Sequence, residues 1–191
     1  MVTRVVLIAA RPTPWDTELR LVGSRPLPLT AEAIDSIRHL LQTLPYPITS
    51  VYRPAANEAC DQAARLVAQH FHLRVRDNAG LENIHLGLWE GLTPEEIRFR
   101  FPTVFPEWEA NPLAVVPPDG EPLAGAIKRI SGAVTQILRR NRGECVGLAL
   151  RPMAFQIAAG VLMGESPQTM AGHLHQDVSI ATIEPSLTDQ K

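Results

Sequence analysis

The most informative positions in this chain are the ends of two predicted strands. The first strand covers Val5–Ile8 and runs into Ala9-Ala10-Arg11-Pro12, and the second covers 146–150 and runs into Arg151-Pro152. Open α/β sheets place their sites at the carboxyl ends of strands. A phosphate-handling enzyme would carry catalytic histidines there, but neither strand end contains one. The pattern is typical of a retained scaffold from which the reactive groups have been removed.

The predicted elements that position these strand ends alternate between strand and helix. Apolar residues at helical spacing predict helices over 31–44, with Thr30 as N-cap, and over 55–71 and 123–140. Further strands are predicted over 48–52, 73–75 and 178–183. This order indicates an α/β three-layer sandwich: a mostly parallel sheet with helices on both faces.

One segment interrupts the alternation. Residues 78–122 are rich in Pro, Gly, Trp and acidic side chains, with one clear helix start at Thr93-Pro94. The segment is too long for a plain crossover and is interpreted as a lid insert. Its aromatic residues either line a lid pocket or, as we expect, form a small core: Trp89, Phe105 and Trp108. The whole chain is then one domain over 1–185 with a polar tail over 186–191.

Charge and composition limit the partners. The net charge of -2 and the absence of a basic run give no reason to expect nucleic acid or an anionic membrane as a partner. The sequence begins almost directly with a strand and has no apolar run long enough to span a bilayer, so we expect a cytoplasmic protein. Any anionic ligand would be small and locally held.

Cysteine and histidine spacing predicts neither a disulfide nor a metal site. Cys60 and Cys145 lack CxxC spacing and are expected to be reduced, packed thiols. His173, His175 and Asp177 have no further ligand nearby, so a surface histidine pair is expected. No cofactor is predicted.

Taken together, the landmarks resemble the histidine phosphatase superfamily, the phosphoglycerate mutase-like group, over nearly the whole chain. No single motif is specific for a family, but the shared order and spacing of the motifs are specific. The matching landmarks are AARPT at 9–13, Trp15-Asp16 where the family has an aromatic residue and an asparagine, Gly23, Leu29-Thr30, RPAANEACDQA at 53–63, and the block from Leu81-Glu82 through Gly87 and Trp89 to Thr93.

The resemblance implies which positions should carry the reaction. Family members transfer a phosphoryl group to a histidine, assisted by arginines, a second histidine and a carboxylic acid. Ala9 stands at the position of the family's first arginine, and Ala10 at that of its nucleophilic histidine. Glu58 stands at the position of the second arginine, and Arg151 at that of the last histidine. Only the acid survives, as Glu82. Alanine cannot attack phosphorus, and a glutamate in a partly buried pocket would repel an anion, so the family reaction is expected to be absent.

New cations accompany these losses. Arg11 stands where the family has glycine, Arg53 where it has serine, and Arg151 where it has histidine. Their guanidinium forks suit phosphate or carboxylate, which predicts a pocket that binds a small anionic or phosphorylated ligand without turnover. The anion-binding candidates are Arg11, Thr13, Arg53 and Arg151.

Three alternatives remain open at this stage. Glu58 and Glu82 could pair with Arg53 and Arg151 and fill the cavity with internal salt bridges. The chain could be an active phosphatase or mutase-like enzyme that uses Glu82 with His85 or a water molecule. It could also be a structural or interaction subunit, with a homodimer among the options.

Overall fold

A five-stranded sheet forms the centre of the computed structural model, which describes residues 3–174 and 176–185. The strands are β1 (Arg4–Ala9), β2 (Ser50–Arg53), β3 (Val75–Asp77), β4 (Cys145–Leu150) and β5 (Ile180–Ile183). Their order is β3-β2-β4-β1-β5. Neighbouring strands are parallel except for β5, which runs antiparallel to β1. The predicted mostly parallel sheet is confirmed.

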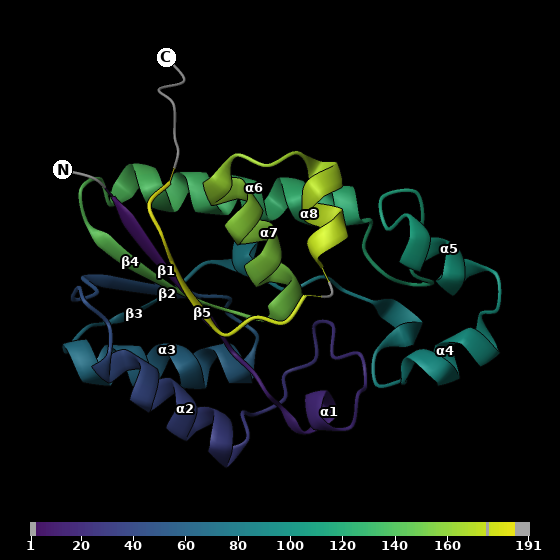
Figure 1. Cartoon of the computed structure of the whole chain (residues 1–191), viewed down its shortest axis with the longest axis horizontal. Helices are drawn as coiled ribbons and strands as arrows, with labels where there is room; N and C mark the ends of the chain where they lie inside the picture. Colours follow the sequence, from purple (N-terminus) through teal and green to yellow (C-terminus); the bar gives the residue numbers. More distant parts are fainter. Residues whose placement is uncertain (1–2, 175, 186–191) are drawn as a thin grey trace.

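Helices cover both faces of the sheet (Figure 1). Helices α2 (Ala31–Gln42) and α3 (Glu58–Phe71) lie on one face, and α6 (Leu123–Arg140) and α7 (Pro152–Met163) on the other. The chain is therefore an α/β three-layer sandwich, as the sequence predicts. No helix among the described residues is long and apolar enough to cross a membrane.

The central strand β1 shows why each face has its own core. Successive side chains of a strand point to opposite faces of the sheet, so a fully apolar strand contributes side chains to the core on each face. The two sets are Val5, Leu7 and Ala9 on the α6 and α7 face, and Val6, Ile8 and Ala10 on the α2 and α3 face. The end of this strand, where the resemblance predicts catalytic residues, is thus packed into the interior, with Ala10 fully buried.

Side-chain caps mark the starts of α2 and α3. Thr30 accepts a hydrogen bond from Ala33 N, as predicted for an N-cap. Helix α3 begins at Glu58 rather than at 55, because the side chain of Asn57 accepts from Cys60 N and so caps the helix there. Helix α6 has the predicted bounds.

The segment 78–122 holds more structure than the sequence predicts. Its elements are η1 (Ala79–Leu81), η2 (Gly87–Trp89), α4 (Pro94–Arg100) and α5 (Val104–Ala110). Thr93 caps α4 through a capping box with Glu96, which confirms the predicted helix start. Trp89, Phe105 and Trp108 are buried against one another and belong to the core under α6 and α7, so they form core rather than line a pocket. A lid role for this segment stays a prediction.

Outside the segment 78–122, two further short helices were not predicted. They are α1 (Pro14–Thr17) and α8 (Pro167–His173), and each begins at a proline that follows a capping Thr13 or Ser166. The last strand starts at Ile180, two residues later than expected. The predicted tail over 186–191 lies outside the described residues.

Candidate functional site

The two strand ends meet in space because β1 and β4 are neighbours. Ala9 pairs with Leu150 in the register of the sheet, and Ala10 N donates to Leu150 O at 2.7 Å. The next residue after β4 is Arg151, which is the N-cap of α7. Ala10 and Arg151 are thus brought together at the carboxyl edge, as the sequence predicts.

A buried ion pair occupies this edge. Arg151 Nη2 donates to Asp16 Oδ2 at 2.9 Å and to Oδ1 at 3.0 Å, and Arg151 Nη1 donates to Ala10 O. The side chain of Arg151 is 2% exposed and that of Asp16 11% exposed. The guanidinium is therefore held by a carboxylate of the chain itself.

Asp16 is fixed from its other side by Thr13. Thr13 N and Thr13 Oγ1 both donate to Asp16 Oδ2 at 2.6 Å. Burial alone would raise the pKa of Asp16, but the charge of Arg151 and the hydrogen bonds from Thr13 and Arg151 outweigh it, so the pKa is lowered. Thr13, predicted to bind an external anion, instead holds this internal carboxylate.

A cavity of about 150 Å³ adjoins the ion pair. Asp16, Arg20, Asn83 and Arg151 supply its polar lining. Arg151 Nε is buried with no hydrogen-bond partner among the described residues. Most of the donor capacity of Arg151 is nevertheless committed to Asp16 and Ala10.

The other two candidate arginines also have partners within the chain. Arg53 lies 3.1 Å from both Asp61 Oδ1 and Asp77 Oδ1. Arg11 Nη1 lies 2.7 Å from Asp177 Oδ1. The three arginines thus pair with different carboxylates rather than sharing one.

The glutamates do not make the pairs considered from the sequence. Glu82 Oε1 accepts from Ala56 N at 3.0 Å. Glu58 is exposed, and Gln62 Nε2 donates to it at 3.4 Å. The expected repulsion by Glu58 inside a partly buried pocket is therefore wrong. Internal salt bridges do hold the arginines, but their partners are aspartates, which the sequence analysis did not consider in that role.

Cys60 lies close enough to the site for the charges of Arg151 and Glu82 to act on it. Burial raises the pKa of this thiol to about 12, and the charge of Arg151 only partly opposes the rise. Cys60 and Cys145 are both buried and free of disulfides, as expected. A protonated, inaccessible thiol is a poor nucleophile, so Cys60 is not a candidate for one.

Two buried polar side chains missed by sequence reasoning shape the edge of the site. Asn83 Nδ2 donates to Gly23 O at 2.7 Å, while Asn83 Oδ1 accepts from Ala154 N at 3.0 Å in the first turn of α7. The carboxylate of Glu90, 1% exposed, accepts from the backbone N–H groups of Ser24 and Leu86. Both belong to the Leu81–Thr93 block, whose density of motif residues was the available signal.

None of the described histidines lines the cavity beside Arg151. His85 is exposed, and its backbone N–H and C=O both bond to Glu121. His173 Nδ1 lies 3.4 Å from Glu165 Oε2. His175 lies outside the described residues, so the predicted surface histidine pair stays a prediction.

Comparison with known proteins decides the family. The sequence profile of the histidine phosphatase superfamily (branch 1) matches residues 11–190. The chain belongs to this superfamily. The match runs from the first strand end to beyond the last strand and confirms the resemblance seen in the motifs.

Relatives and solved structures agree with this membership. The chain is 24% identical over 149 residues to phosphoserine phosphatase 1 of Hydrogenobacter thermophilus, a match that covers 78% of this chain and 66% of that relative. It is similar to YhfR of Bacillus stearothermophilus, with a TM-score of 0.81, 24% identity and coverage of 95% and 91% of the two chains. It is also similar to the alpha-ribazole phosphatase of Shigella flexneri, with a TM-score of 0.79, 20% identity and coverage of 87% and 83%. At these identities the structural likeness concerns the fold.

Proposed function

We propose that this member of the superfamily does not turn over phosphoesters and serves a binding or regulatory role. The observation that carries the proposal is the buried pair between Arg151 and Asp16 at the strand ends. In family terms Arg151 stands at a histidine position and Asp16 at an asparagine position. The two residues carry opposite charges, and each is the ion-pair partner of the other.

The chemistry of the site supports this proposal. The methyl group of Ala10 offers no lone pair to attack phosphorus. The Asp16 carboxylate already occupies the guanidinium fork that a phosphate would need. A phosphoester entering here would meet this negative charge in a largely buried setting. The site thus lacks both a nucleophile and a free anion receptor.

An active phosphatase is the second candidate, and the comparisons favour it at least as well. Two of the proteins compared above are named as phosphatases. Glu82, at the position of the family acid, is only partly buried. Such an enzyme would need a water molecule or His85 as its nucleophile, since Ala10 cannot act. An interaction subunit, with or without homodimer formation, stays a third prediction.

Hydrolysis assays separate the first two candidates. We expect no turnover of p-nitrophenyl phosphate, phosphoserine or phosphoglycerates above the level of a mock purification. The variant Glu82→Gln and a matched control on the exposed first turn of α2, Glu32→Gln, should behave like the wild type. Turnover that Glu82→Gln abolishes and Glu32→Gln leaves intact would establish the phosphatase instead.

A second experiment tests whether Asp16 fills an anion position. In Asp16→Ala, Arg151 loses its counter-charge and should accept inorganic phosphate. Phosphate at ten times its Kd would then stabilise the variant by about 1.4 kcal/mol relative to chloride of equal ionic strength. The wild type should show no such gain. Equal responses of the two proteins in thermal unfolding would contradict the proposal.

A further inference from the structure

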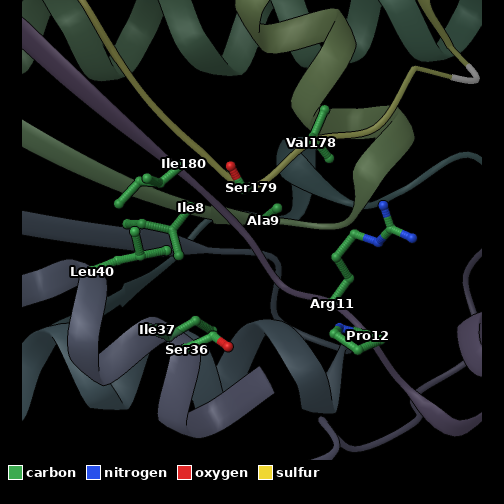
Figure 2. Close-up of a pocket in the computed structure, with 10 residues that line it drawn as sticks. All are labelled: Ile8, Ala9, Arg11, Pro12, Ser36, Ile37, Leu40, Val178, Ser179 and Ile180. Carbon is green, nitrogen blue, oxygen red and sulfur yellow. The ribbon is translucent and has the colours of Figure 1, made fainter. Parts of the chain in front are cut away.

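A larger cavity than the one beside Arg151, of about 270 Å³, adjoins the end of β1 (Figure 2). It opens between α2, the end of β1 and the chain leading into β5. Its lining residues are Ile8, Ala9, Arg11, Pro12, Ser36, Ile37, Leu40, Val178, Ser179 and Ile180. None of them lines the cavity beside Arg151, so the two cavities are separate.

The walls of this cavity are apolar with one cationic side. Ile8, Leu40 and Ile180 gather on one side, while Arg11 extends from the strand end toward Val178 (Figure 2). Arg11 is the one charged residue among those that line the cavity. The lining therefore suits a ligand with an apolar body and a negative head group.

Arg11 is available for such a ligand. Its partner Asp177 has a side chain that is 97% exposed, and an ion pair with so exposed a carboxylate contributes little to stability. A ligand carboxylate could therefore take the place of Asp177 at small cost. Arg11 also stands at a glycine position of the family pattern, so this cation is a feature of the present chain.

The size and charge of the cavity select the ligand class. A cavity of about 150 Å³ can hold benzene, with its six carbon atoms, so 270 Å³ accommodates about ten non-hydrogen atoms. One guanidinium matches the single charge of a carboxylate better than the double charge of a phosphate monoester. We propose that this cavity binds a small monocarboxylate with an aliphatic body, of about the size of octanoate.

Calorimetry with octanoate tests this site in the intact chain. The wild type should bind one octanoate per chain, and 1-octanol, which lacks the charge, should bind more weakly. Arg11→Gln should weaken octanoate binding about tenfold and leave 1-octanol unchanged, because only the charged hydrogen bonds are lost. Ser36→Phe, at an exposed rim position, should block both ligands.

Arg38→Gln is the matched control for the loss of an arginine. Arg38 lies on α2, which lines the cavity, but it pairs with Asp35, and neither of these two residues lines the cavity. This variant should bind octanoate like the wild type. Absence of saturable binding would overturn the site, as would equal affinity in the wild type and Arg11→Gln. Tighter binding of octyl phosphate than of octanoate would overturn the carboxylate assignment. The result is independent of phosphatase activity, which does not enter this proposal.

Discussion

Replacing Arg151 by methionine should lower the free energy of unfolding by about 3 kcal/mol at pH 7. Arg151 is 2% exposed and Asp16 11% exposed, so the variant leaves a carboxylate in a largely buried place without its counter-charge. Methionine keeps much of the volume of the side chain, which limits any effect of an empty cavity. The loss therefore reports mainly on the charge.

The magnitude follows from the contacts of Asp16. Breaking a buried ion pair from one side typically costs about 3 to 5 kcal/mol. Asp16 keeps two donors from Thr13, which places the expected loss at the lower end of that range. For a chain of 191 residues the midpoint of thermal unfolding should fall by about 6 to 12 °C. The exposed pair of Arg38 and Asp35 gives the control: Arg38→Gln should cost about 0.5 kcal/mol or less.

A double-mutant cycle and a pH series sharpen this prediction. The combination of Asp16→Asn with Arg151→Met should cost about 2 kcal/mol less than the sum of the single changes. The pKa of Asp16 is lowered on folding, so its contribution is present above the unfolded value of about 3.9 and is lost as the pH falls through the folded value. The wild type should therefore lose stability more steeply than Arg151→Met as the pH falls below about 5.

Urea unfolding followed by tryptophan fluorescence measures all these differences, since Trp89 and Trp108 are buried. Circular dichroism of each variant confirms that the starting state is folded. A loss below about 1 kcal/mol for Arg151→Met, together with additive single changes, would refute a tight internal pair. The interpretation of the site as internally filled would then fail as well.

Two further predictions concern other buried features. Gly87→Ala should lower the free energy of unfolding, measured in urea, by about 2 kcal/mol or more. Gly87 has φ +56, and a Cβ there would lie 2.0 Å from Pro118 O. An unchanged urea midpoint would show that this turn can rearrange. Neither Cys60 nor Cys145 should react with iodoacetamide at pH 8 in the folded protein. Both thiols are buried, and burial raises the pKa of Cys60 to about 12. Rapid labelling of Cys60 without denaturant would contradict this.

Much of the fold could be predicted because its signals are local. Helix α6 follows directly from apolar spacing over 123–140, and Thr30 and Thr93 mark helix starts through their own side chains. The short helices α5 and α8 were not predicted, because the apolar spacing of seven residues is too short to distinguish a helix from a loop. Helix α3 began later than predicted because the cap at Asn57 overrides good helix formers before it.

The sequence by itself determined the superfamily and the sheet, since these depend on motif order and on neighbouring residues, and it predicts the positions where the catalytic groups of the family should stand. Only the tertiary structure decided what Arg151 does there. Its partner Asp16 is 135 positions away and becomes a neighbour because β1 and β4 pair side by side. Ion-pair partners are chosen by distance and burial in space, and these are set by packing that no local pattern encodes. The same packing turned Arg11 toward a separate cavity and left Glu58 exposed to solvent.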